Sequence, residues 1–232
     1  MILCYGSAII WIDIFQQFLS ESGSNRNALN IENHWESLYQ RTALDKVSWY
    51  QETPEISLDL IEKTGVPKDA PILDVGSGAS TLADQLLQRG YWNLALLDVS
   101  ACALALTRQR LGGKAIDVTW HHGDITRYVL PRRYALWHDR AVFHFLMDPT
   151  VRQAYIANLR KVLRPKGHLI LSTFAVGGPT RCSGLSVTQY DPQKITAELG
   201  QDFRLIETLE ESHQTPAGVE QLFSYFWFTR DR

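Results

Sequence analysis

The stretch PILDVGSGAST, residues 71–81, leads from apolar residues through Asp74 into a turn that contains Gly76 and Gly78. A short apolar strand followed by a glycine-rich turn and a helical pattern is typical of sheets whose parallel strands alternate with helices. The glycines permit tight curvature and close approach of other groups. In such sheets ligands bind outside the carboxyl ends of the strands, so the turn is a candidate site for a phosphate or for another polar group.

The following hundred residues repeat the alternation of strand and helix. Apolar runs that suit buried strands occupy residues 72–75, 93–99, 115–122, 134–141 and 168–175. Helical patterns occupy residues 80–90, 101–111 and 150–163. Gly90, Gly113 and the Pro-Lys-Gly sequence at 165–167 mark where helices should stop. Together these patterns predict a parallel, doubly wound sheet with helices on both faces.

The two ends of the chain depart from this pattern. Residues 31–64 are helical in pattern at both ends, with a loop between. After a helical pattern around residues 192–200, residues 202–212 and 220–230 have the pattern of two strands. The sequence between these strands is too short for a helix, so we expect them to pair as antiparallel neighbours.

Residues 1–30 are predicted to form an extension before the domain. The first residues are apolar, but Asp13 interrupts them and no Lys or Arg precedes Arg26. A signal peptide would need a positive start, and a membrane span would need about 18 apolar residues. We therefore expect an apolar helix without membrane contact, with an anchor as the alternative. Residues 21–30 have the composition of a polar linker, and residues 31–232 form the predicted domain.

Composition sets limits on function. The chain has 232 residues, of which 45% are hydrophobic and 21% charged, which suits one globular domain with a sizeable core. The net charge is −2 and the basic residues are scattered, so nucleic acid is not an expected partner. Cys4, Cys102 and Cys182 show no zinc-ligand spacing. We expect no metal, and free thiols in the reducing cytoplasm.

Acidic residues follow three successive predicted strands. Asp74 opens the glycine turn, Asp98 ends the next strand, and Asp124 follows Gly123 after the third. A carboxylate at the second position can accept hydrogen bonds from both hydroxyls of a ribose, and the third position can address an adenine edge. The turn alone is a weak signal, because Thr81 stands where the dinucleotide fingerprint has its third glycine. The ordered set of three is a much stronger one.

These residues belong to a wider resemblance. Residues 34–229 resemble class I S-adenosylmethionine (SAM)-dependent methyltransferases. The motifs that carry the resemblance are ILDVGSGAS (72–80), LLDVS (96–100), HHGDIT (121–126), WHDRAVFHFL (137–146), LRKVLRPKGHLILSTF (159–174) and the terminal strand LFSYFWF (222–228). A helix that ends in VLRPKG before a buried strand is especially typical of the family. Ser80 departs from it, since a third glycine is usual at that position.

The resemblance implies a three-layer α/β/α fold around a mostly parallel seven-stranded sheet in the order 3-2-1-4-5-7-6, with the last strand antiparallel. It also implies SAM as cofactor and S-adenosylhomocysteine (SAH) as product. The implied contacts with the methionine part of SAM are those of Asp74, Gly76, Ser77 and Gly78. The implied contacts with the nucleoside are those of Asp98 with the ribose, and of Val99, Asp124 and Ile125 with adenine.

A second polar group follows the predicted fourth strand. The resemblance implies that Asp139 borders both cofactor and acceptor, and His138 and Arg140 flank it. The ordinary pKa range of His144 suits a general base near neutral pH. Asp139 and His144 are therefore the candidate catalytic residues, and a histidine satisfied by the core is the alternative for His144.

Further residues are candidates for the acceptor pocket. Arg140 ends the fourth strand, and Arg181 and Cys182 lie in the loop after the fifth. Similar methyltransferases use an aromatic segment before the first strand as a lid, where an aromatic face attracts the sulfonium charge of SAM. The lid candidates within residues 31–70 are Trp35, Tyr39, Trp49 and Tyr50, with core packing as the alternative for each. Residues 71–232 then form the Rossmann-like core.

The leading functional hypothesis is SN2 transfer of the SAM methyl group to an N, O or S nucleophile. The compact chain and the short loop after the fifth strand favour a small-molecule acceptor, and a protein lysine is the alternative. A dehydrogenase that uses NAD(P) would share the glycine turn and the ribose acid, but it would not require Gly123-Asp124 or the VLRPKG ending. A non-catalytic SAM-binding module is a further alternative. The carboxylate of Asp74 would repel a phosphate and attract an ammonium group.

Overall fold

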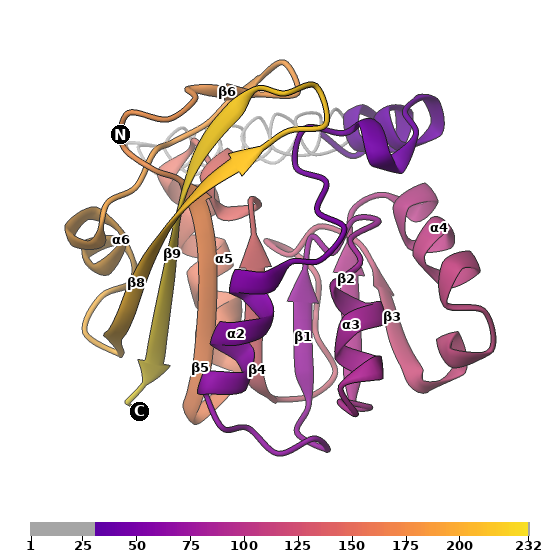
Figure 1. The fold of residues 1–232 in the computed structure, drawn as a ribbon. Coiled ribbons are helices and arrows are strands. Elements are labelled where there is room, and N and C mark those ends of the chain that lie inside the picture. Colours follow the sequence, from indigo (N-terminus) through magenta and orange to yellow (C-terminus); the bar gives the residue numbers. More distant parts are fainter. Residues whose placement is uncertain (1–30, 232) are drawn as a thin grey trace, which may run out of the picture.

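A computed structural model describes residues 31–231 of the chain. They contain a seven-stranded sheet in the order β3-β2-β1-β4-β5-β9-β8 (Figure 1). Strands β1 to β5 run parallel, whereas β9 is antiparallel to both of its neighbours. The strands are β1 (Ile72–Val75), β2 (Leu94–Asp98), β3 (Val118–His122), β4 (Tyr134–Arg140), β5 (Leu163–Phe174), β8 (Phe203–Gln214) and β9 (Glu220–Arg230). The predicted strand order and the antiparallel last strand are confirmed, with β8 and β9 as the sixth and seventh strands.

Helices cover both faces of this sheet (Figure 1). One face carries α5 (Pro149–Val162) and α6 (Pro192–Leu199). The other face carries α2 (Glu55–Lys63), α3 (Leu82–Gln88) and α4 (Ala101–Leu111). Residues 31–41 are also helical. Three short 3-10 turns are η1 (Leu44–Lys46), η2 (Gly112–Asp117) and η3 (Phe143–Phe145).

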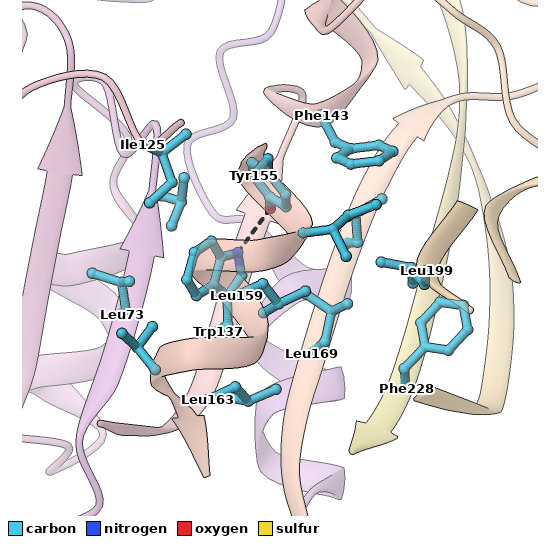
Figure 2. Packing of buried hydrophobic residues seen from close by; sticks show 14 of the residues in the cluster. Leu73, Ile125, Trp137, Phe143, Tyr155, Leu159, Leu163, Leu169, Leu199 and Phe228 are labelled. Carbon is cyan, nitrogen blue, oxygen red and sulfur yellow. Dashed lines mark hydrogen bonds between the residues drawn. The ribbon is translucent and has the colours of Figure 1, made fainter. Parts of the chain in front are cut away.

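The core on the α5 face is built from alternate strand residues. Because side chains along a strand point to opposite faces in turn, Leu73, Trp137 and Leu169 all project to this side. They pack against Tyr155 and Leu159 of α5, as Figure 2 shows. The indole N–H of Trp137 donates a hydrogen bond to the Tyr155 hydroxyl at 2.8 Å, so the polar atoms of these two large side chains satisfy each other.

The strand residues in between build the second core. Ile72, Leu136 and Ile170 project to the opposite face, where they pack with Leu58 of α2 and Leu86 of α3. All five side chains are almost completely buried. Two cores on opposite faces of one sheet give the three-layer sandwich that the sequence predicts.

Capping residues in the sequence explain where three helices begin. Ser100, Asp148 and Asp191 each accept a hydrogen bond from a backbone N–H in the first turn of α4, α5 and α6. Pro149 and Pro192 stand in the first turn of α5 and α6, where a missing N–H is tolerated. These helices accordingly start at or next to the predicted residues.

Strand β5 begins earlier than predicted. Leu163 already pairs with Tyr134, and the register then shifts before His168 pairs with Leu136. Lys166 has a φ of 61° within this irregular stretch. The Pro-Lys-Gly sequence therefore lies within β5 and forms a bulge there. It does not separate the preceding helix from the strand.

The loop after β5 contains a small hairpin that the sequence analysis did not predict. Strands β6 (Arg181–Cys182) and β7 (Leu185–Ser186) pair as antiparallel neighbours.

In residues 31–231, no helix is both long and apolar enough to span a membrane. The predicted extension, residues 1–30, lies outside the described residues.

Candidate active site

A cavity of about 1290 Å³ lies at the carboxyl ends of β1, β2 and β4. It reaches from the loop after β3 to the β6–β7 hairpin. The predicted site residues that line it are Trp35, Tyr39, Trp49, Tyr50, Asp74, Gly76, Ser77, Gly78, Asp98, Val99, Asp124, Ile125, Arg140 and Cys182. Three other predicted residues, Asp139, His144 and Arg181, do not line it.

The glycine turn is shaped by backbone conformation and by close neighbours. Gly76 and Gly78 have φ values of 60° and 53°, in the left-handed region that favours glycine. A β-carbon on Gly76 would collide with the Val142 side chain, and one on Gly78 would collide with the Tyr39 hydroxyl. Both positions are thus restricted to glycine by strain and by lack of space.

Asp98 is buried at the end of β2 and is held by two backbone groups. Its Oδ2 accepts a hydrogen bond from the Gly78 N–H at 2.7 Å, and its Oδ1 accepts one from the Ser100 N–H at 2.8 Å. Burial raises the pKa of Asp98 to about 6. Each carboxylate oxygen retains further acceptor capacity, so a pair of hydroxyls at the cavity could still be bound.

Asp74 has a partner that the sequence analysis did not identify. The Nδ1 of His138 lies 2.7 Å from Asp74 Oδ1, and its Nε2 lies 2.9 Å from the Ser57 hydroxyl. All three side chains line the cavity. Strand alternation could have indicated His138, because residues 138 and 140 of β4 must share one face. Nothing in the sequence indicated that Ser57, in α2, would meet them.

Asp139, predicted to border cofactor and acceptor, follows His138 directly in β4. Its side chain points to the opposite face, where it is fully buried. The carboxylate accepts hydrogen bonds from the Tyr155 hydroxyl at 2.6 Å and from the Val142 N–H at 2.9 Å. Burial raises the pKa of Asp139 to about 6. Asp139 therefore holds the turn after β4 against α5 and does not line the cavity.

His144, predicted as a general base, lies in the core and does not line the cavity. Its ring is fully buried against Phe145 and Phe174, and Nδ1 accepts a hydrogen bond from the Phe174 N–H at 3.3 Å. Burial, with a smaller effect of Arg140, lowers the pKa of His144 to about 3. Its Nε2 is buried without a hydrogen-bond partner among the described residues, so the core satisfies only one of the two ring nitrogens.

Residues 31–51, here called the covering segment, lie over the carboxyl ends of the strands (Figure 1). The ring centroid of Trp35 lies 5.7 Å from that of Trp49 and 5.1 Å from that of Phe145, both edge-on. Tyr39 packs with Ala79 of the glycine turn and with Ala103 of α4. The aromatic residues thus form one wall of the cavity and also pack on the domain beneath.

Polar contacts hold the covering segment in place. Glu36 accepts hydrogen bonds from the Ser100 hydroxyl at 2.7 Å and from the Cys102 N–H at 3.0 Å, at the start of α4. A carboxylate at a helix N-terminus is favoured by the helix dipole. At the other end, the Nε2 of His213 in β8 lies 2.8 Å from the Ser48 carbonyl.

Arg140 joins three parts of the chain beside the cavity. Its Nε donates to the Tyr225 hydroxyl at 2.8 Å, and its Nη1 donates to the Trp49 carbonyl at 3.0 Å. Its Nη2 lies 3.6 Å from a carboxylate oxygen of Glu211, which also accepts a hydrogen bond from Tyr225. Arg140 therefore couples β4 and the β8–β9 hairpin to the covering segment.

The remaining predicted residues lie at the two ends of the cavity. Asp124 accepts hydrogen bonds from the Thr126 N–H and hydroxyl, which fixes the loop after β3 beside Ile125. At the other end Cys182 is buried, and burial raises the pKa of its thiol. Arg181 is exposed and donates to the Gly184 carbonyl within its own hairpin.

In residues 31–231 there is no cluster of three or more side chains suited to a metal ion.

Comparison with known proteins identifies the domain. Residues 72–167 match the family model of a methyltransferase domain. This range runs from β1 into β5 and contains the glycine turn and the three acidic positions of the cavity. Residues 72–167 carry a methyltransferase domain, and the fold around them is that of class I SAM-dependent methyltransferases. The match supports the methyltransferase prediction over the dehydrogenase alternative.

Curated relatives of this methyltransferase domain are distant in sequence. EEF1A lysine methyltransferase 2 of Homo sapiens is 23% identical over 207 residues, which cover 82% of this chain and 80% of that protein. The Mus musculus protein of the same name is 29% identical over 165 residues, which cover 63% of this chain and 66% of that protein.

Solved structures share the fold. The N-methyltransferase NodS from Bradyrhizobium japonicum, in complex with SAH, is 18% identical and has a TM-score of 0.65, covering 86% of this chain and all of that one. The glycopeptide N-methyltransferase MtfA in complex with SAH is 17% identical and has a TM-score of 0.61, covering 83% of this chain and 95% of that one.

Proposed function

We propose that the methyltransferase domain transfers a methyl group from SAM to a nucleophilic N, O or S atom of a small molecule. One observation supports this most directly: a single cavity joins the acidic ends of β1 and β2 to an aromatic end beneath the covering segment. A methyl donor and its acceptor have to meet in one such space, in line and away from water.

The acidic side of the cavity suits the cofactor. Asp74 would face the ammonium group of SAM, Asp98 would accept the ribose hydroxyls, and Ile125 would lie beside adenine. The hydroxyl of Ser77 is buried and has no hydrogen-bond partner among the described residues, so it is free to bind the cofactor carboxylate. When bound, SAM supplies a methyl group that its positive sulfur already activates.

The chain itself contributes alignment and the exclusion of water, and neither residue predicted to act in catalysis lines the cavity. Asp139 and His144 lie outside the cavity, and both ring nitrogens of His138 are engaged. Burial raises the pKa of Tyr39, so its phenol stays protonated near neutral pH. We therefore propose that the acceptor enters with its lone pair already free, as a neutral amine or a thiolate does.

The acceptor end of the cavity supports a small molecule. Trp35, Trp49 and Phe145 line one side, and Cys182 and Leu185 of the β6–β7 hairpin line it from another part of the chain. Covering from two sides, with mostly apolar walls, is typical of pockets that bury most of a small ligand.

A protein lysine is the second candidate acceptor. The curated relatives described above are lysine methyltransferases. Aromatic rings such as those of Trp35 and Trp49 attract an ammonium or methylammonium group through their faces. The aromatic end of the cavity therefore also suits a lysine side chain that enters from a partner protein.

A labelling experiment distinguishes these acceptors. The protein would be incubated with SAM labelled in its methyl group and with either the dialysable or the protein fraction of a cell lysate. We expect label in a dialysable product, which mass spectrometry would identify. Label on lysine residues of a protein would favour the second candidate. If calorimetry shows SAH binding but neither fraction is labelled, a non-catalytic SAM-binding module is favoured.

A further inference from the structure

Three polar side chains on the cofactor side of the cavity form a hydrogen-bonded chain. His138 links Asp74, at 2.7 Å from Nδ1, to Ser57, at 2.9 Å from Nε2. Asp74, His138 and Ser57 are 5%, 3% and 0% exposed, respectively, yet all three line the cavity. Each polar atom of the imidazole has a partner, so the ring has no nitrogen left to contact a substrate directly.

Three separate elements hold this chain in place. In the register between the parallel strands β1 and β4, Asp74 stands directly opposite His138. Both side chains project to the face covered by α2, whose first turn supplies Ser57. Because two strands and a helix fix the three groups, the carboxylate has little freedom to rotate away from the cavity.

The direction of each hydrogen bond follows from the chemistry of the groups. An ionised Asp74 can only accept, so Nδ1 of His138 carries the proton and donates it. In a neutral imidazole, Nε2 would then accept a hydrogen bond from the Ser57 hydroxyl. The hydrogen bond from His138 uses Oδ1 of Asp74, which leaves the acceptor capacity of Oδ2. That oxygen remains available for a ligand.

We propose that His138, held by Ser57, positions the Asp74 carboxylate for the ammonium group of the cofactor. His138 and Ser57 are then positioning residues, since neither has to touch the ligand. The inference rests on the proposed function, because it requires a cofactor with an amino-acid part beside Asp74.

Two ligands separate this role from a general loss of structure. SAH contains the amino-acid part, whereas 5′-methylthioadenosine contains the nucleoside but lacks the ammonium group. The affinity of both would be measured by calorimetry for the wild type and for His138→Gln, His138→Asn and Ser57→Ala. The asparagine amide can replace Nδ1 as a donor to Asp74, whereas the glutamine amide lies nearer the position of Nε2.

We expect His138→Gln to weaken SAH binding about tenfold, the effect of one hydrogen bond to a charged group, with methylthioadenosine binding unchanged. His138→Asn should keep most of the SAH affinity, and Ser57→Ala should weaken SAH alone, by a smaller factor. An equal loss of both ligands, or unchanged SAH affinity in both His138→Gln and Ser57→Ala, would overturn the inference.

Failure of the cofactor assignment would look different. A wild-type protein that binds neither ligand would overturn the proposed function together with this inference. A wild type that binds both, combined with variants that show no selective loss of SAH, would overturn the positioning role alone. If His138→Gln fails to fold, Ser57→Ala removes a single hydroxyl and tests the same point.

Discussion

The Tyr39 hydroxyl lies against Gly78, at the place where a β-carbon on that residue would project. Gly78 also has a φ of 53°, so its conformation and its surroundings each exclude a side chain. The covering segment therefore rests on the glycine turn itself. Any change that lifts Tyr39 also disturbs the cofactor side of the cavity.

Gly78→Ala should lower the free energy of unfolding and weaken SAH binding. The left-handed φ alone costs an alanine about 1 kcal/mol, and displacement of Tyr39 adds to that. Gly65→Ala is a matched control, because Gly65 has a φ of 70° but no neighbour within 4 Å of the new β-carbon. Denaturant unfolding and calorimetry would measure both effects, and the control should retain SAH affinity.

Tyr39→Phe should partly rescue Gly78→Ala. Removing the hydroxyl takes away the atom that the new β-carbon meets first, while the ring remains. The double variant should therefore be more stable than the sum of the two single changes indicates. Strict additivity in a double-mutant cycle would show that the contact between these residues carries no free energy.

Asp98 should make SAH binding dependent on pH. Burial raises its pKa to about 6, and both oxygens already accept backbone hydrogen bonds, so the ionised form is the one that can also accept from a ribose. Below this pKa, Asp98 has to lose its proton before the ribose can bind. The affinity for SAH should therefore rise about tenfold for each unit by which the pH increases, until the pH reaches the pKa of Asp98. Above that it should level off.

Asp98→Asn provides the control for this titration. The amide cannot ionise, and its NH₂ group would oppose one of the two backbone N–H groups. SAH should bind this variant weakly and without the acidic slope. Calorimetry across the acid-to-neutral range measures both proteins, and a wild-type affinity that is flat with pH would contradict the assignment.

Arg140→Met should loosen the covering segment and lower stability. The side chains of Arg140 and Glu211 are only 11% and 14% exposed, so removing the cation leaves a nearly buried carboxylate without its cationic partner, although Tyr225 still donates to it. Such a loss costs about 3 kcal/mol. Hydrogen exchange should increase around residues 47–51, because the Trp49 carbonyl loses its donor.

A control and a rescue make the Arg140 result interpretable. Arg160 also forms an ion pair, with Asp202, and donates a hydrogen bond to the Leu199 carbonyl, but it does not line the cavity. Arg160→Met should therefore destabilise the fold without faster exchange at residues 47–51. Adding Glu211→Gln to Arg140→Met should recover part of the stability, and no recovery would argue against the ion pair.

His144→Asn should leave the pH profile of methyl transfer unchanged. The residue lies outside the cavity, and the asparagine carbonyl can accept the Phe174 N–H in place of Nδ1. A changed profile would restore His144 as a candidate base. His144→Leu should lower stability by about 1–3 kcal/mol, because it leaves that buried N–H without an acceptor.

Stability at acidic pH gives a second test of His144. Its pKa in the folded protein is about 3, lower than the ordinary value of about 6.5 in an unfolded chain. Between these values the unfolded state binds the extra proton, so the folded protein loses stability as pH falls below about 6.5. His144→Asn should lose less stability over that range in denaturant unfolding at several pH values. An identical slope in both proteins would contradict the lowered pKa.

The sequence predicted the sheet well because its signals are local. The apolar runs, the glycine turn and the capping residues Ser100, Asp148 and Asp191 each act over a few neighbouring positions. The site predictions that the structure does not support concern residues whose role depends on the face of the sheet to which the side chain points. Asp139 and His138 are adjacent in sequence, and strand alternation sends them to opposite faces, so the residue assigned to the site was the one that faces the core.

The sequence alone determined the fold and the acidic positions at the carboxyl ends of β1 and β2, and it indicated the family. These features follow from hydrophobic periodicity and turn residues, which depend only on residues close together in the sequence. Only the tertiary structure decided which groups meet in the cavity. Ser57 lies 81 positions before His138 and reaches it only because α2 packs across β1 and β4. Such a pairing depends on strand register and helix placement together, and no local pattern encodes it.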